Sequence, residues 1–163
     1  MTRERVALVR REAERPRWTS APRIGIVYSS ENWAYVEALV NALRYELTEH
    51  YHFSPINIKL TQTESIHDIP LFVAHQHQRS DLVFALGVVF RHAPTFEPRL
   101  ADAITQRIHA IPMPGRLPVF DCILVRDSEK QLDAHLAAVD DGMPAVWARR
   151  AIDTYAMMTK PAI

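Results

Sequence analysis

The residue types in this sequence that can do chemistry gather in four short segments, each of which follows an apolar stretch. These segments are residues 28–33, 63–69, 91–98 and 125–128. They carry aromatic, carboxylate, imidazole and guanidinium side chains, which can stack on a planar ligand, accept its hydrogen bonds or hold an anion. We therefore expect a small-molecule site built from these segments.

Two histidines and one carboxylate in these segments are candidates for direct chemistry. His92 suits general acid–base catalysis, because an imidazole titrates near neutral pH; the alternative is a solvated loop histidine. His67 can contact a ligand or be an ordinary surface residue. Asp68 stands before Ile69-Pro70, so its carboxylate can bind a ligand hydroxyl or act as the N-cap of a helix.

The cationic candidates lie at the ends of two apolar stretches. Arg126 can bind an anionic group of a ligand, and Arg91 is a second cation of the same kind. The alternative for Arg126 is an ion pair with Asp127, Glu129 or Asp121, and surface ion pairs of that kind contribute little stability.

Metal and nucleotide sites of the familiar kinds are not expected. His75 and His77 are two residues apart, so they lie on different faces of a helix and do not form a ligand pair. Cys122 is the single cysteine; it lies in an apolar stretch, which favours a buried core thiol and a reducing, cytoplasmic location. Of four glycines only Gly87 stands at a strand end, so a glycine-rich phosphate loop is absent.

Composition and charge exclude several classes of partner. Lys plus Arg and Asp plus Glu are both 19 in 163 residues, so no net charge attracts nucleic acid or an anionic membrane. The longest apolar run, 82–90, is about half of what a membrane span needs. We expect one globular domain at 23–163, preceded by a charge-dense arm at 1–22.

The elements that must position the four segments follow from hydrophobic periodicity. Short runs rich in β-branched residues predict strands at 23–28, 56–60, 81–90 and 117–125. Helical spacing predicts helices at 32–50, from 69 onward, 100–111, from a Ser128–Gln131 capping box to about 138, and 144 to about 158. Residues 81–90 are apolar throughout, which is typical of a strand covered on both faces near the centre of a parallel sheet.

Four β–α units and a final helix predict an α/β fold, a three-layer α/β/α sandwich with a parallel sheet. Ligands of such sheets bind at the carboxyl ends of the strands. The four segments named above are the loops at those ends, so the predicted fold brings them together.

Residues 81–91, Asp-Leu-Val-Phe-Ala-Leu-Gly-Val-Val-Phe-Arg, resemble a strand of the 6,7-dimethyl-8-ribityllumazine synthase family that reads D-x-V-I-A-L-G-V-V-I-R. Residues 26–32 are similar to the family's I-V-x-S-R-F-N, 68–71 to E-I-P-L, and 117–119 to V-P-V. Order and spacing agree over about residues 23–158. The resemblance implies the lumazine synthase (flavodoxin-like) fold.

The resemblance also implies an activity in riboflavin biosynthesis. Family members condense 5-amino-6-(D-ribitylamino)uracil with 3,4-dihydroxy-2-butanone 4-phosphate, so the implied partners are a ribityl-pyrimidine and a sugar phosphate. They use no metal or organic cofactor, and they assemble as pentamers, some as larger shells. The resemblance therefore implies a homopentamer or larger, with the site shared between neighbouring subunits.

Transferred position by position, the family's site is altered here. The ring-stacking phenylalanine falls on Glu31, the catalytic histidine on Phe96, and the phosphate-binding arginine and lysine on His135 and near Asp141. His92 is the nearest proton carrier, four positions before Phe96. We expect His92 to be catalytic and the following residues to bind substrate: Asn32, Trp33, His67, Asp68, Arg91, Phe96, Arg126 and His135.

Three interpretations stay open at this stage. The chain is an active lumazine synthase with a rearranged site, a paralogue that acts on another small molecule, or a non-catalytic subunit that keeps only the scaffold. Fold alone does not distinguish them, because function depends on the site.

Overall fold

The structure is a computed structural model that describes residues 21–94, 96–111, 119–136 and 142–159, without the side chains of residues 135 and 136. The expected arm at 1–22 lies almost entirely outside the described residues. The same is true of the Pro-Met-Pro-Gly stop at 112–115 and of most of the turn at 140–142.

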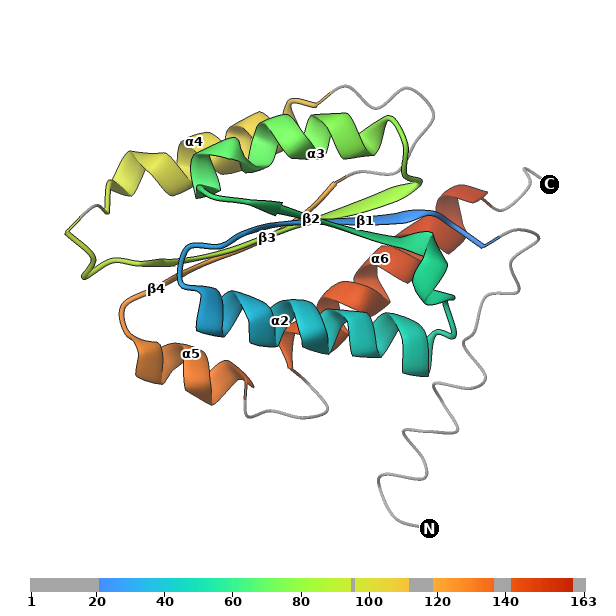
Figure 1. Cartoon of the computed structure of the whole chain (residues 1–163), viewed down its shortest axis with the longest axis horizontal. Helices are drawn as coiled ribbons and strands as arrows, with labels where there is room; N and C mark the ends of the chain where they lie inside the picture. The colour runs from blue at the N-terminus through green and yellow to red at the C-terminus, as the bar shows by residue number, and fades with distance from the viewer. Residues whose placement is uncertain (1–20, 95, 112–118, 137–141, 160–163) are drawn as a thin grey trace, which may run out of the picture.

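Four parallel strands form one sheet in the order β2-β1-β3-β4. Helices α3 and α4 cover one face, and α2, α5 and α6 cover the other, which makes three layers (Figure 1). The predicted three-layer α/β/α sandwich is therefore confirmed. The strands are β1 (Ile24–Ser29), β2 (Ile58–Thr63), β3 (Leu82–Phe90) and β4 (Phe120–Arg126), and the helices are α2 (Trp33–Tyr45), α3 (Ile69–His77), α4 (Pro98–His109), α5 (Glu129–Leu136) and α6 (Met143–Thr159).

The two central strands supply most of the core. β1 is buried at every residue and β3 at all but one, as the unbroken apolar run at 81–90 predicts. Their side chains alternate between two clusters, with Phe84 and Leu86 facing α2 and α6, and Val83 and Ala85 facing α3 and α4. This packing fixes the carboxyl ends of β1 and β3 side by side, in a register that pairs Tyr28 with Leu86.

Several predicted boundaries differ from the structure by a few residues, and two of these differences have a local cause. The second strand was expected at 56–60 but is Ile58–Thr63, because Pro55–Asn57 form a 3-10 turn before it. The helix predicted at 32–50 is α2 continued by a π-helical turn, Glu46–His50. Among the described helices none is long and apolar enough to cross a bilayer.

A capping arrangement starts α5, as predicted from Ser128 and Gln131. The backbone N–H of Gln131 donates to Ser128 Oγ at 3.4 Å. The Gln131 side chain accepts from the Asp127 N–H at 2.9 Å, one residue earlier than in a standard capping box. This cap holds the loop that follows β4 against the start of α5.

Candidate functional site

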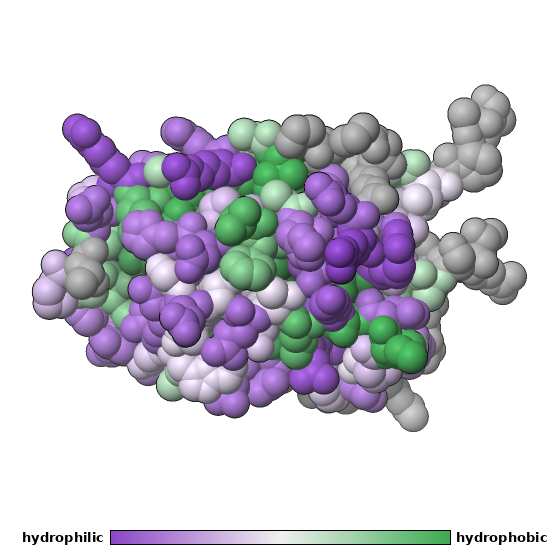
Figure 2. Space-filling view, turned by 45° about the horizontal axis from the view of Figure 1, so that its top comes forward, coloured by the Kyte–Doolittle hydropathy of each residue, from purple (hydrophilic) through white to green (hydrophobic). Residues whose placement is uncertain are grey.

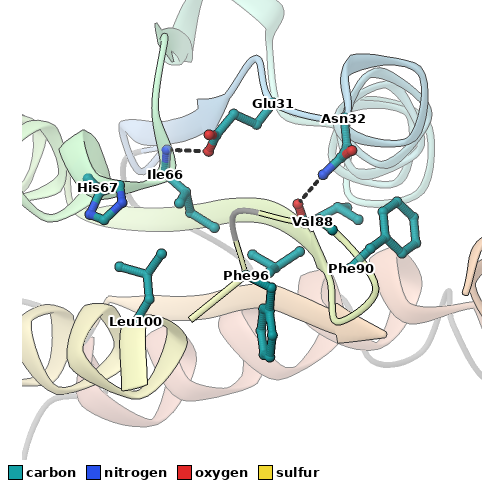
Figure 3. Close-up of a pocket in the computed structure, with 10 residues that line it drawn as sticks. Glu31, Asn32, Ile66, His67, Val88, Phe90, Phe96 and Leu100 are labelled. Carbon is teal, nitrogen blue, oxygen red and sulfur yellow. Dashed lines mark hydrogen bonds between the residues drawn. The ribbon is translucent and has the colours of Figure 1, made fainter. Parts of the chain in front are cut away.

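A pocket of about 290 Å³ opens at the carboxyl ends of β1 and β3. In Figure 3, Glu31 and Asn32 border it from the β1–α2 side, while Phe96 and Leu100 lie on the α4 side. The lining residues come from three of the four loops that the sequence singled out and from the elements next to them. They are Glu31, Asn32, Ile66, His67, Val88, Val89, Phe90, Ala93, Phe96 and Leu100.

Asn32 is held in the left-handed backbone region, with φ of 55°, at the start of α2. Asparagine tolerates this conformation better than most residues. Its Nδ2 donates to the Val88 carbonyl at 2.8 Å, which joins the start of α2 to strand β3. The same hydrogen bond identifies Oδ1 as the amide's remaining acceptor, and no described residue donates to it.

Glu31 joins two of the loops around the pocket. Its Oε2 accepts from the Ile66 N–H at 2.8 Å and from the Ser29 hydroxyl at 3.4 Å. The Ser29 Oγ in turn accepts from the Glu31 N–H at 3.1 Å. The end of β1 is thereby tied to the turn after β2, and Figure 3 shows the Glu31–Ile66 contact.

A glycine in β3 lets that turn approach the sheet. A Cβ added at Gly87 would meet Ile66 Cδ1 at 3.0 Å and Ile69 Cδ1 at 3.5 Å. Ile66 is buried at 3% exposure, so it packs into the space that a side chain at position 87 would fill. The absent Cβ of Gly87 thus sets the position of the Ile66 N–H that Glu31 binds.

The turn after β2 places two of the predicted residues differently. His67 lines the pocket, and its backbone N–H donates to Ser65 Oγ at 3.2 Å. Asp68 occupies the N-cap position of α3 but makes no capping hydrogen bond with its side chain. Asp68 is therefore the N-cap residue by position, but its carboxylate does not make the capping hydrogen bond that we expected. The side-chain cap in this turn is Ser65, which caps the 3-10 turn Ile66–Asp68 that leads into α3.

The loop after β3 is fastened outside the pocket by one ion pair and one histidine–carboxylate contact. Arg91 Nη1 lies 2.6 Å from Asp127 Oδ1, and His92 Nε2 lies 3.2 Å from Glu129. The His92 ring also stacks on Phe90, with centroids 5.3 Å apart and planes at 15°. His92 and Arg91 are therefore not among the lining residues, although Phe90 is.

These pairs affect the carboxyl groups at the start of α5. The hydrogen bond from Arg91 holds the pKa of Asp127 below its ordinary value, with a second contribution from Gln131. The pKa of Glu129 is also lowered, first by its own backbone N–H and then by His92. Both carboxylates are exposed, so solvent screens much of this interaction.

Arg126 does not form any of the ion pairs expected for it. Asp127 pairs with Arg91, Glu129 with His92, and Asp121 accepts from the Thr105 hydroxyl at 2.6 Å. The half-buried Arg126 guanidinium instead donates to the Val125 carbonyl at 2.8 Å and contacts Met143 Sδ at 3.4 Å. Its Nε is buried with no partner among the described residues.

The pocket therefore unites only part of the predicted site. Asn32, His67 and Phe96 line it. Trp33 stacks on Tyr28 instead, with ring centroids 5.8 Å apart. Trp33, Asp68, Arg91, His92 and Arg126 are outside the lining set, and the side chain of His135 lies outside the described residues.

Glu31 is the polar pocket residue that the sequence reasoning did not select. By the family resemblance this position is that of a missing aromatic ring, which says nothing of its carboxylate. The signal was available, since a charged residue directly after a buried strand in a parallel sheet stands where ligands bind. Ile66, Val88, Val89 and Leu100 were missed as pocket residues because they read as ordinary core positions.

The charge of the pocket limits its chemistry. Among the described lining residues Glu31 carries the only fixed charge, His67 is the only other titratable side chain, and neither arginine nor lysine is present. No group of three His, Cys, Asp or Glu residues able to hold a metal occurs in the described ranges. The lining suits an uncharged planar ligand with one hydrogen-bonding edge and one apolar face.

These features define a parallel α/β protein, covered on both faces, with a small-molecule pocket at the carboxyl ends of its central strands. A model of the 6,7-dimethyl-8-ribityllumazine synthase family matches residues 21–159. The chain therefore belongs to the lumazine synthase family, whose role is riboflavin biosynthesis.

Two curated relatives agree with this assignment. The 6,7-dimethyl-8-ribityllumazine synthase of Mycobacterium avium (strain 104) is 31% identical over 113 residues, which cover 69% of this chain and 68% of the relative. The protein of the same name from Mycolicibacterium paratuberculosis (strain ATCC BAA-968 / K-10) gives the same values.

Proposed function

We propose that this protein condenses 5-amino-6-(D-ribitylamino)uracil with 3,4-dihydroxy-2-butanone 4-phosphate to form the ribityllumazine. The observation that supports this is the pocket at the carboxyl ends of β1 and β3, in a chain of the lumazine synthase family. Its volume of about 290 Å³ suits a single pyrimidine ring, since ligand pockets begin at roughly this size.

In this proposal the pocket residues divide the work. Asn32 and Glu31 present acceptors to the ring, while Leu100 and Phe96 contribute apolar contact. Schiff-base formation and phosphate loss require a proton carrier, and His67 is the histidine among the lining residues. His92 remains a candidate, because its ring stacks on Phe90, which lines the pocket.

A second candidate function is binding of the ribityl-pyrimidine or a related flavin precursor without condensation. The observation that favours it is the absence of arginine and lysine from the described pocket lining, because a sugar phosphate is normally held by such cations. Arg91 is already paired with Asp127, and Arg126 lies outside the pocket.

The proposal includes assembly into a homopentamer or larger, in the cytoplasm. Large apolar side chains are exposed on α3, where Leu71 is 70% and Phe72 37% exposed, and on α2, where Tyr45 is 58% exposed. Figure 2 shows apolar side chains among polar ones on the face that carries α3 and α4. An assembly that covers such side chains would also let a neighbour supply the cation that the pocket lacks.

The direct test supplies both substrates and follows the absorbance and fluorescence of the lumazine product. We expect product from the unmodified protein, a loss of about a hundredfold or more in His67→Ala, and a smaller loss in His92→Ala, since general acid–base groups typically contribute about 10²–10⁴-fold. No product, together with calorimetric binding of the ribityl-pyrimidine, would support the second candidate. Light scattering tests the assembly, and a monomer of 18.7 kDa would contradict it.

A further inference from the structure

The Glu31 carboxylate has two oxygens with different surroundings. Both hydrogen bonds that it accepts, from Ile66 N–H at 2.8 Å and from the Ser29 hydroxyl at 3.4 Å, go to Oε2. Within the described part of the chain, Oε1 accepts no hydrogen bond. One oxygen therefore holds the loops together, and the other is available to a ligand in the pocket that Glu31 lines.

A second acceptor stands next to it. Because Asn32 Nδ2 donates to the Val88 carbonyl at 2.8 Å, the side-chain Oδ1 of Asn32 is the free end of that amide. Both residues line the pocket from the β1–α2 side, opposite Leu100 and Phe96 (Figure 3). The polar border of the pocket thus offers acceptors, one of them charged, and its opposite border offers apolar surface.

We propose that Glu31 is a specificity-determining residue, whose Oε1 accepts a hydrogen bond from a ring or amino N–H of an uncharged heterocycle and whose charge disfavours anions on the β1–α2 side of the pocket. The proposal rests on the proposed function for the identity of the heterocycle, an aminopyrimidine. It assigns recognition to the N–H edge of the ring, at a position where the family resemblance implies an aromatic side chain against the ring face.

Physical chemistry gives the expected preference. A carboxylate accepts hydrogen bonds from N–H donors more strongly than a neutral group does. A phosphate dianion consists mainly of acceptor oxygens and would be repelled by the same carboxylate, with no arginine or lysine among the described lining residues to offset the repulsion. The pocket should therefore bind the aminopyrimidine better than it binds inorganic phosphate.

The test is titration calorimetry with 5-amino-6-(D-ribitylamino)uracil and, separately, with inorganic phosphate. Glu31→Gln is the informative variant, because the glutamine oxygen can still accept from the Ile66 N–H while its NH₂ group turns a donor toward the ligand. Glu64→Gln makes the same chemical change in the neighbouring loop, at an exposed residue that does not line the pocket, and is the matched control.

We expect Glu31→Gln to weaken pyrimidine binding about tenfold or more, since a hydrogen bond to a charged group contributes at least that factor. Phosphate binding should become tighter in the same variant. Glu64→Gln should bind both compounds as the unmodified protein does. The thermal midpoint of Glu31→Gln should be unchanged, because the glutamine oxygen still accepts from the Ile66 N–H. A purely structural role of Glu31 would instead lower the midpoint.

Unaltered pyrimidine affinity in Glu31→Gln, or an equal loss in Glu64→Gln, would overturn the proposal, as would an unmodified protein that binds phosphate more tightly than pyrimidine. The outcome is separable from that of the proposed function. Glu31-dependent pyrimidine binding without lumazine formation would refute the activity and leave this inference standing. Lumazine formation together with unaltered pyrimidine binding in Glu31→Gln would support the activity and refute this inference.

Discussion

Gly87 provides a quantitative test of how the sheet positions the pocket. An alanine Cβ there would lie 3.0 Å from Ile66 Cδ1 and 3.3 Å from Ile66 Cγ1, which is closer than ordinary van der Waals contact. Overpacking of this kind costs about 1–3 kcal/mol, and the lower backbone entropy of unfolded alanine returns about 0.4–1 kcal/mol. The difference between these two contributions is about 0–2.6 kcal/mol, so we expect Gly87→Ala to lower the free energy of unfolding by up to about 2.6 kcal/mol.

The variant should also alter ligand binding, because the Ile66 N–H donates a hydrogen bond to the Glu31 carboxylate at 2.8 Å. Pushing Ile66 away by a few tenths of an ångström should weaken affinity for the ribityl-pyrimidine several-fold. Urea unfolding at one fixed protomer concentration measures the stability, since any assembly makes the midpoint concentration-dependent. Calorimetry measures the affinity.

Gly25→Ala is the matched control. Its Cβ would meet Ser80 Oγ at 3.1 Å, a similar crowding on the same sheet face but near the opposite strand ends. We expect a comparable loss of stability with no change in ligand affinity.

Ile66→Val removes the atom that Gly87→Ala would meet first. The double variant should therefore lose less stability than the sum of the two single variants, by about 0.5–1 kcal/mol or more. Strict additivity, or an equal loss of affinity in Gly25→Ala, would refute the reasoning.

Three further outcomes follow from the structure. Phe84→Ala should cost about 3–5 kcal/mol in urea unfolding, because Phe84 is fully buried beside Phe120; a cost below about 1 kcal/mol would contradict that packing. Cys122 should resist alkylation at neutral pH until the protein unfolds, since burial raises its pKa well above the ordinary value, and rapid labelling of folded protein would show otherwise. Arg91→Gln should raise the Asp127 pKa toward normal in an NMR titration. The pKa of Asp127 is lower in the folded protein than in the unfolded chain. The ionised Asp127 therefore stabilises the folded protein above the pKa of the unfolded carboxyl group, and this stabilisation is lost as the pH falls through the pKa of Asp127 in the folded protein. Arg91→Gln should therefore reduce the loss of folding stability at low pH. An unchanged Asp127 pKa in this variant would contradict the ion pair.

Periodicity was sufficient to predict the layers of this fold. The unbroken apolar run at 81–90 predicts a central strand, and β3 lies between β1 and β4. The second strand was misplaced because Ile56 is apolar and in phase with Ile58, yet it belongs to the 3-10 turn and is 89% exposed. Proline at position 55 favours such a turn at the start of the strand. The alternation of apolar and polar residues alone does not predict that turn.

The site was harder to predict, because side-chain pairing across loops decides which groups face a ligand. Arg91 and His92 carry suitable chemistry, but their partners Asp127 and Glu129 are 36 and 37 residues away in the sequence. Glu31 shows the converse case, in which a residue that breaks the family pattern lines the pocket. Residue type at a strand end therefore locates the site, and only the three-dimensional contacts distinguish its members.

The stacked pair Tyr28–Trp33 gives the protein an optical reporter. Trp33 is 40% exposed and is the chain neighbour of Asn32, whereas Trp147 packs against the core. Indole emission responds to changes in local polarity, and Tyr28 at 5.8 Å is close enough to transfer excitation energy to it. In a Trp18→Phe variant, which removes the third tryptophan of the sequence, a ligand that shifts Asn32 should therefore change the indole emission. That would allow compounds to be screened without a label or a coupled reaction, before any activity is known.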